Sequence, residues 1–159
     1  MKNVILLFLV IIGISCTQKK NKISIIKFPE LEETILNSQS EYLVVNFWAT
    51  WCAPCVKELP QFDLLLTKNK NLKVVLVSFD FAEQLEKKVI PFVEKRQIKS
   101  EVVLLDETDY NAFIDKIDPS WSGAIPATLI VNNRTGKRVF YEKEFKVGEL
   151  EAAFNTIMN

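Results

Sequence analysis

The apolar positions of this chain form two patterns: short continuous runs, and segments in which they recur every three or four residues. The runs at 42–48 and 73–79 are apolar on both faces, which predicts strands in the middle of a covered sheet. Shorter runs at 23–28 and 101–105 predict two further strands. Helices are predicted over residues 29–38, 53–69, 82–96, 110–117 and 150–157.

Prolines refine these boundaries. Pro29 suits the first turn of a helix, where its missing N–H is not needed. Pro60 and Pro91 fall inside helical patterns, where a proline removes a hydrogen bond and crowds the preceding turn. We therefore expect a kink at Pro60 and a bend or division of the 82–96 segment at Pro91.

Toward the end of the chain, residues 127–131 and 137–142 predict two strands joined by turn residues at 132–136, which is typical of a hairpin. Upstream, strand and helix alternate four times, and this alternation implies parallel strands with helical crossovers. The sequence predicts an α/β fold with a mixed sheet, a C-terminal β-hairpin and a final helix. The length of 159 residues suits one domain, expected at 23–159.

The N-terminal segment has a different character. Lys2 precedes an apolar run at 4–14, long enough for an export signal but short for a membrane span. A small residue and then Cys16 follow, which resembles a bacterial lipoprotein signal, although Gly13 stands where that pattern has leucine. The resemblance implies a signal at 1–16, a lipid on Cys16 and a protein anchored outside the cytoplasm. The alternative is an ordinary export signal with an incidental cysteine.

Composition narrows the choice of partners. A polar linker at 17–22 separates the signal from the predicted domain. Lys and Arg together number 20, as do Asp and Glu, so the formal net charge is zero. Without a basic stripe, nothing favours nucleic acid as a partner. The chain contains no histidine, and in an exported protein disulfides persist.

Two thiols stand out. Cys52 and Cys55 lie where the predicted strand 42–48 gives way to the predicted helix 53–69. Unpaired N–H groups and the helix dipole favour a thiolate at such a position. Because the thiolate is the nucleophile of disulfide exchange, we expect Cys52 to attack a disulfide. Cys55, one turn further along, is placed to resolve the mixed disulfide.

Other uses of this cysteine pair fit less well. A structural disulfide across so short a loop constrains the unfolded chain little. A structural zinc site needs about four Cys or His ligands, and Cys16 is the only other candidate. Haem attachment requires histidine where Val56 stands, and a Sco-type copper chaperone also wants one. The preferred interpretation is redox exchange without a metal.

Residues 46–60, NFWATWCAPCVKELP, resemble the active-site motif of the thioredoxin superfamily, and more narrowly that of the exported TlpA/ResA-like thiol-disulfide oxidoreductases. The resemblance covers residues 40–158 by element order. It implies a thioredoxin-like three-layer α/β/α fold with no cofactor beyond a redox-active Cys52–Cys55 disulfide. Asn46 stands where cytosolic thioredoxins carry a buried acid, and we expect it to be a buried, hydrogen-bonded amide.

The resemblance also assigns neighbouring residues. Glu58 matches a glutamate placed near the cysteines of this branch, which suggests a proton acceptor or donor during exchange. An acid that merely stabilises the first helical turn is an equally good interpretation. Ile125–Pro126 matches a cis-proline peptide, whose exposed backbone would bind an extended substrate. The statistics of X-Pro bonds alone favour trans.

The residues expected to bind substrate are Trp51, Pro54, Trp121, Ile125 and Pro126. Tryptophans of this kind belong more often to the core, so Trp121 is the least specific of these assignments.

The leading hypothesis is a thiol-disulfide oxidoreductase of the bacterial cell envelope. It would reduce protein substrates that carry disulfides, with electrons from a membrane thiol protein. One alternative, a peroxiredoxin-like peroxidase, requires a threonine three residues before its cysteine, where Ala49 stands. The other alternative is a non-catalytic thioredoxin-fold binding module, against which the intact Cys-x-x-Cys motif speaks.

Overall fold

The computed structural model describes residues 22–158. The predicted signal at 1–16, with its Cys16, and the linker at 17–22 apart from Lys22 lie outside the described residues. Within the described range, no helix combines the length and the apolar character needed to cross a membrane.

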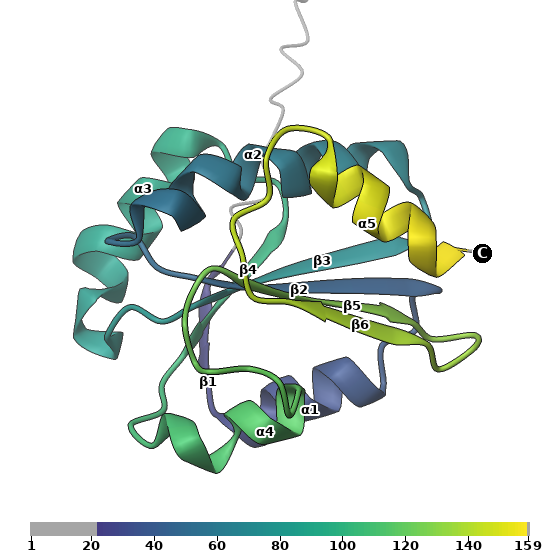
Figure 1. The fold of residues 1–159 in the computed structure, drawn as a ribbon. Helices are drawn as coiled ribbons and strands as arrows, with labels where there is room; N and C mark the ends of the chain where they lie inside the picture. Colours follow the sequence, from purple (N-terminus) through teal and green to yellow (C-terminus); the bar gives the residue numbers. More distant parts are fainter. Residues whose placement is uncertain (1–21, 159) are drawn as a thin grey trace, which may run out of the picture.

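The middle layer is a six-stranded sheet with the order β1-β4-β3-β2-β5-β6 (Figure 1). Its strands are β1 (Ser24–Ile26), β2 (Tyr42–Trp48), β3 (Leu72–Ser78), β4 (Glu101–Leu105), β5 (Ala127–Asn132) and β6 (Arg138–Tyr141). Strands β1 to β4 pair in parallel, whereas β5 runs antiparallel to β2, and β6 antiparallel to β5. The predicted mixed sheet with its C-terminal hairpin is confirmed.

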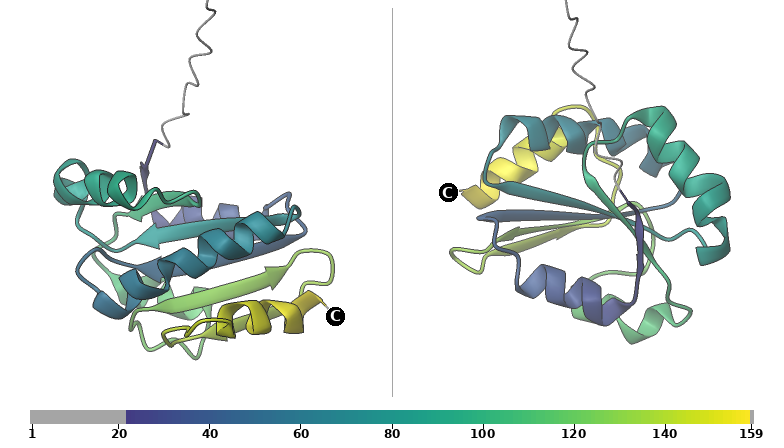
Figure 2. Two further views of the ribbon diagram at one scale, coloured as in Figure 1. Left: turned by 90° about the horizontal axis from the view of Figure 1, so that it is seen from above. Right: turned by 180° about the vertical axis from the view of Figure 1, so that it is seen from behind.

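Helices cover both faces of this sheet and complete the three layers (Figures 1 and 2). The α-helices are α1 (Phe28–Leu36), α2 (Ala53–Lys68), α3 (Ile90–Arg96), α4 (Ile114–Ile117) and α5 (Glu149–Met158). Helices α2, α3 and α5 lie over one face, and α1 and α4 over the other. The chain steps from β2 to β3 to β4 in one direction, so right-handed crossovers place α2 and α3 on the same face.

Three predicted elements differ most from the structure. One is the 110–117 helix, which is a 3₁₀ turn (Tyr110–Ala112) followed by the short α4. The first strand ends at Ile26 instead of residue 28, because Lys27 already caps α1: its backbone N–H donates to the Glu30 carboxylate over 2.8 Å. The predicted 82–96 helix is divided into a 3₁₀ turn (Ala82–Gln84), a π-helical segment (Leu85–Val89) and α3. The division falls just before Pro91, which has no N–H to continue the preceding hydrogen bonds. Helix α2, in contrast, continues through Pro60.

Strand β2 is the centre of the core. Its side chains at residues 43–48 are all fully buried, because β3 and β5 flank the strand and helices cover both faces. Alternate residues face opposite layers: the Trp48 ring lies 5.3 Å from that of Phe92 in α3, whereas the Phe47 ring lies 4.5 Å from that of Trp121. Asn46 is the one polar residue in this run, and it faces α2.

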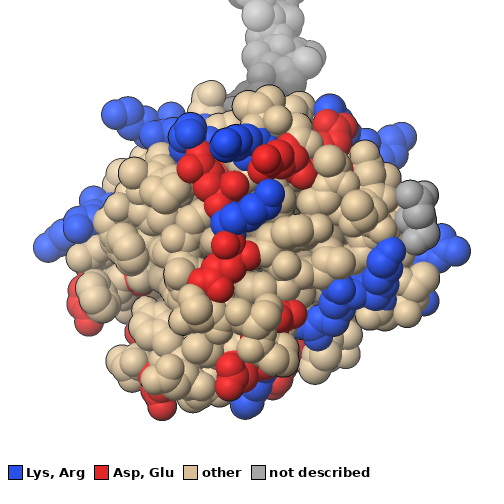
Figure 3. All heavy atoms as spheres, in the orientation of Figure 1, with Lys and Arg blue, Asp and Glu red and all other residues tan. Residues whose placement is uncertain are grey.

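The surface contributes less to stability than this core. On the face shown in Figure 3, acidic and basic side chains lie beside one another. One such pair joins α2 to α5, with Lys68 Nζ 2.9 Å from Glu151 Oε1. Both side chains are about half exposed, and surface ion pairs of this kind are typically worth about 0–1 kcal/mol.

Replacing a buried ring on α2 should therefore destabilise the fold strongly. Phe62 is fully buried, and Phe62→Ala is expected to lower the free energy of unfolding by about 3–5 kcal/mol. Leu64, two residues along the same helix, is 54% exposed, and Leu64→Ala should cost less than about 1 kcal/mol. Urea unfolding of the oxidised proteins measures both values, and equal losses would contradict this account of the core.

Candidate active site

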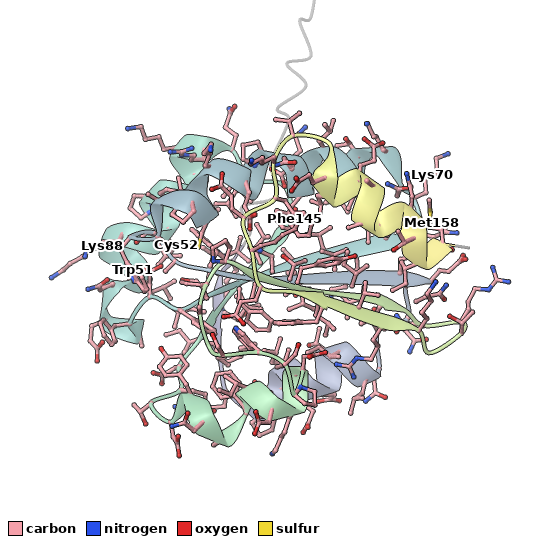
Figure 4. The ribbon with its side chains drawn as sticks, in the orientation of Figure 1. Trp51, Cys52, Lys70, Lys88, Phe145 and Met158 are labelled. Carbon is pink, nitrogen blue, oxygen red and sulfur yellow. A yellow bond between two sulfur atoms is a disulfide. The ribbon has the colours of Figure 1, made fainter. Side chains whose placement is uncertain are left out.

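The cysteine pair lies at the carboxyl end of β2, where the central strand passes into α2 (Figure 4). Cys52 is the N-cap residue of α2, and its backbone is extended. Its carbonyl accepts a hydrogen bond from Val56 N over 3.0 Å, which begins the helix. The predicted junction of strand and helix is thus present, with Cys52 outside the first turn and Cys55 within it.

Cys52 and Cys55 form a disulfide. Cys52 Sγ also accepts a hydrogen bond from the backbone N–H of Cys55 over 3.3 Å. This N–H lies in the first turn of α2, where backbone N–H groups have no partner within the helix, and it points at the sulfur. Cys52 is 5% exposed and Cys55 is completely buried. The sulfur of an approaching molecule therefore reaches Cys52 first, and Cys55 is accessible only to Cys52.

The Ile125–Pro126 peptide lies against the disulfide. The peptide bond between Ile125 and Pro126 is cis, as the family resemblance implies. The Ile125 carbonyl oxygen is 3.9 Å from Cys52 Sγ, a van der Waals contact in the disulfide form because that sulfur carries no proton. Ile125 is half-buried and Pro126 is buried, so the peptide presents its Ile125 side to the site.

The aromatic residues separate into two groups. Trp51 is 65% exposed beside Cys52, and Pro54 in the first turn of α2 is exposed as well. Trp121 is only 3% exposed and packs among the rings of Phe47, Phe79, Phe113 and Phe140. The ring of Trp121 thus belongs to the core and is not an exposed wall of the site. Its Nε1–H donates to the Ala124 carbonyl over 2.9 Å, which supports the loop before Ile125.

Glu58 is completely buried one turn beyond Cys55, on the same side of α2. Asn46 Nδ2 donates to its Oε1 over 2.9 Å, and the backbone N–H of Phe145 donates to its Oε2 over 2.6 Å. Its carboxylate is therefore held by β2 and by the segment before α5. Neither of these two donors belongs to the first turn of α2.

Burial raises the pKa of Glu58 from its ordinary 4.5 to about 7. The hydrogen bonds from Phe145 and Asn46 act in the opposite direction, and the nearby charge of Glu144 adds to the rise. Desolvation dominates because the site supplies two donors and no cation to this carboxylate. A group with a pKa near 7 gives up and regains a proton readily at neutral pH.

Asn46 joins this carboxylate to the rest of the site. Besides Glu58, its Nδ2 lies within hydrogen-bond distance of Thr128 Oγ1, at 3.0 Å, and of the Ala127 carbonyl, at 3.3 Å. The expected buried, hydrogen-bonded amide is confirmed. The two contacts lie directly after Pro126, so one amide connects the cis-proline strand with the helix that carries the cysteines.

Two carboxylates that the sequence did not single out hold the loops around Cys52. Glu142 accepts hydrogen bonds from the backbone N–H groups of Ser122, at 2.9 Å, and Ala124, at 3.3 Å. Hydrogen bonds from Ser122 also keep the pKa of Glu142 below its usual range. Asp80, two residues after β3, accepts hydrogen bonds from Thr50 in the turn before the cysteines. A polar residue at the carboxyl end of an apolar parallel strand was the available signal for Asp80.

Among residues 22–158, no three Cys, His, Asp or Glu side chains come together as a metal site would require.

A buried disulfide at the start of the helix that follows the central strand, beside a cis-proline peptide, defines a thioredoxin-fold protein. The chain belongs to the AhpC/TSA family, whose family model matches residues 17–137. Among solved structures, the fold of this chain is similar to that of a thioredoxin-related protein from Neisseria meningitidis serogroup B. The TM-score is 0.65 and the identity 21%, with 77% of this chain and 90% of that chain covered. StoA from Bacillus subtilis has a TM-score of 0.54 and 23% identity, over 72% and 83% of the two chains.

Relatives with curated names agree with this class. The chain is 30% identical over 102 residues to the thioredoxin-like protein YneN of Bacillus subtilis, which covers 64% of this chain and 59% of that protein. It is 33% identical over 96 residues to the thiol-disulfide oxidoreductase ResA of Bacillus cereus, which covers 60% and 50%. The aligned region thus spans about half to three-fifths of the length of these relatives.

The raised pKa of Glu58 should make stability depend on pH. The folded protein binds this proton more tightly than the unfolded chain, so the stabilising contribution is full below pH 4.5 and lost as pH rises through about 7. Between pH 5 and pH 8 the oxidised protein should lose about 2–3 kcal/mol of unfolding free energy through this group. Glu58→Gln should remove that slope in urea unfolding.

The matched control is Glu33→Gln, which changes an exposed glutamate of α1 and should keep the wild-type slope. If the Glu58→Gln and wild-type proteins respond to pH in parallel, Glu58 does not have the raised pKa that its burial implies.

Proposed function

We propose that this protein is an exported thiol-disulfide oxidoreductase that reduces disulfides in other proteins through the Cys52–Cys55 couple. The observation that carries the proposal is the position of the disulfide. Its outer sulfur lies at a helix N-terminus and touches the Ile125 carbonyl of a cis-proline peptide. The curated relatives named thiol-disulfide oxidoreductases support the same reaction.

The reaction begins with the reduced pair. The Cys52 thiolate attacks one sulfur of a substrate disulfide, which breaks the substrate S–S bond, releases one substrate thiolate and forms a mixed disulfide. Cys55, as a thiolate, then attacks Cys52 Sγ, re-forms the internal disulfide and releases the second substrate thiolate. The substrate gains two electrons and the protein loses two. A thiol donor must then reduce the Cys52–Cys55 disulfide again.

Glu58 is proposed to take the proton from Cys55 in the second step. Spacing along α2 brings the two residues to one side of the helix, and a pKa of about 7 suits a reversible acceptor. As an anion it opposes a thiolate nearby, so Cys55 stays protonated until the mixed disulfide needs it. Asn46 and the Phe145 N–H hold the carboxylate in place meanwhile.

The substrate is proposed to bind as an extended segment across Ile125. Ile125 is half-buried and its carbonyl lies beside Cys52, so a segment paired with its backbone would lie like an added strand. Exposed Trp51 and Pro54 provide apolar contacts next to the reacting sulfur. Buried Pro126 and Trp121 act indirectly, by holding the loop that carries Ile125.

Export and anchoring rest on the N-terminal sequence. The apolar run at 4–14 followed by Cys16 supports a lipid anchor that keeps the domain at a membrane of the bacterial cell envelope, facing the exterior or periplasm. A membrane thiol protein is the proposed electron donor, because the domain needs a reductant in a compartment where disulfides persist.

Cysteine substitutions test the reaction directly. The domain should catalyse dithiothreitol-dependent reduction of insulin, and Cys52→Ala should abolish catalysis because no nucleophile remains. Cys55→Ala should accumulate a mixed disulfide with insulin through Cys52, visible by non-reducing electrophoresis and mass spectrometry. Insulin reduction that survives in Cys52→Ala would exclude the proposal.

The same preparations separate the other candidates. Peroxide consumption that requires Cys52 but not Cys55 would indicate a peroxidase. Partner binding undiminished in a Cys52→Ser/Cys55→Ser protein, without insulin reduction by the wild type, would indicate a binding module. A reduction potential as oxidising as about −120 mV would reverse the proposed direction of electron flow.

Loss of the proposed lipid site should release the protein from the membrane. In a bacterium that processes lipoproteins, the full chain should enter the membrane fraction and incorporate an alkyne-labelled fatty acid. Cys16→Ala should lose the label, and Cys52→Ala, a change in another cysteine, should keep it. A wild-type chain that is exported but neither labelled nor bound to membranes would refute the anchor.

A further inference from the structure

Asp80 is a buried carboxylate next to the turn of residues 49–52, which joins β2 to α2. It is 2% exposed and follows β3 by two residues. Its Oδ2 accepts from the backbone N–H of Thr50 and from the hydroxyl of Ser78, each over 2.8 Å, and its Oδ1 accepts from the Thr50 hydroxyl over 2.5 Å. Within residues 22–158, no Lys or Arg forms a salt bridge with it.

Such a group is costly to bury, and its contacts show what it stabilises. An ionised carboxylate without a cation must be compensated by hydrogen-bond donors. Two of its three donors belong to one residue, Thr50. The third, Ser78, also accepts from the backbone N–H of Asp80 over 3.1 Å, which fixes the carboxylate at the strand end. The whole cluster is therefore directed at the turn that contains Thr50.

The pairing of β2 with β3 ends just before this turn, so the turn needs another interaction to hold it in place. Trp48 and Ser78 are the last paired residues of β2 and β3, and Phe79 N adds one more bond to the Trp48 carbonyl at 2.8 Å. Beyond that point the chain leaves the sheet and must reach the start of α2 within four residues. The Cys52 N–H donates to the Ala49 carbonyl over 3.1 Å, so the turn closes on itself at the residue that carries the outer sulfur.

We propose that Asp80 is a positioning residue for disulfide exchange: by clamping Thr50, it fixes the turn that holds Cys52 Sγ against the Ile125 carbonyl and leaves Trp51 exposed beside it. The proposal rests on the thiol-disulfide function proposed above. Exchange requires the attacking sulfur to lie in line with the substrate disulfide, and small misplacements of reacting atoms reduce rates steeply. Asp80 acts through Thr50 and touches no reacting atom.

Four variants separate this clamp from a general role in stability. Asp80→Ala removes all three hydrogen bonds, whereas Asp80→Asn keeps an acceptor oxygen and an amide that can donate to the Thr50 hydroxyl. Thr50→Val removes the hydroxyl and keeps the backbone bond. Asp63→Ala is the matched control. This α2 carboxylate likewise accepts three hydrogen bonds, from the backbone N–H groups of Lys99 and Ser100 and from the Ser100 hydroxyl, but it lies three turns beyond Cys52.

The rate constant for reduction of a self-quenched cystine peptide is measured with each reduced protein, well below its unfolding temperature. We expect about a tenfold loss in Asp80→Ala, recovery to within about threefold of wild type in Asp80→Asn, and an intermediate loss in Thr50→Val. Asp63→Ala should lose stability but keep the wild-type rate.

A wild-type rate in Asp80→Ala would overturn the proposal. So would an Asp80→Asn protein as slow as Asp80→Ala, which would assign the effect to charge, or an equal loss in Asp63→Ala. If Asp80→Ala does not fold, Thr50→Val decides, and a wild-type rate in that variant refutes the clamp.

A second readout does not depend on the proposed function. Amide hydrogen exchange at Cys52 reports closure of the turn whether or not the protein reduces disulfides. Exchange at this amide should accelerate at least about tenfold in Asp80→Ala and remain unchanged in Asp63→Ala. If the wild type reduces no disulfide, the proposed function fails, and unchanged exchange in Asp80→Ala separately overturns the clamp.

Discussion

The pairing of β2 between β3 and β5 is the constraint on which the rest of the site depends. In parallel with β3 and antiparallel to β5, β2 brings three chain segments to one edge of the sheet: its own exit toward Cys52, the exit of β3 toward Asp80, and the entry of β5 at Pro126. A shift of one residue in either pairing would turn the alternate side chains of β2 to the opposite layer. Asn46 would then no longer face Glu58.

Two buried carboxylates, Glu58 and Asp80, fix the segments around the cysteine pair further through their hydrogen bonds. Glu58 receives donors from β2 and from the segment before α5, and its desolvation still outweighs them. Asp80 receives its donors from Thr50, in the turn before the cysteines, and from Ser78, at the end of β3. The first group is thus suited to exchanging a proton, and the second to holding a backbone turn.

The sequence predicts the regular part of this fold well, because it depends on local patterns. The bounds predicted for the central strand are those observed, and the helix after it is one residue shorter than predicted, since an apolar run and a helical period dominate there. The division before Pro91 was expected, but the π-helical segment was not, because no period distinguishes it. Trp121 is buried by rings from β2 and β6 and from chain segments between the strands, which spacing along the sequence does not reveal.

In the site, too, some features follow from local sequence patterns and others do not. Proximity of Glu58 to Cys55 follows from helical spacing, and the cis peptide at Pro126 follows only from the family resemblance. The hydrogen-bond partners do not follow from either. Thr50 and Asp80 are 30 positions apart, and Glu58 and Phe145 are 87 apart, so their contacts exist only once the sheet has formed.

The contact between Glu58 and Phe145 also concerns how the protein is made. The cysteines and Glu58 leave the ribosome well before Phe145, whose backbone N–H holds the Glu58 carboxylate and which follows Glu58 by 87 positions. During synthesis, the two thiols therefore emerge before the Glu58 carboxylate has the donor at its Oε2. The surroundings of the Cys52–Cys55 pair are therefore complete only after the segment before α5 has been made and has docked on α2.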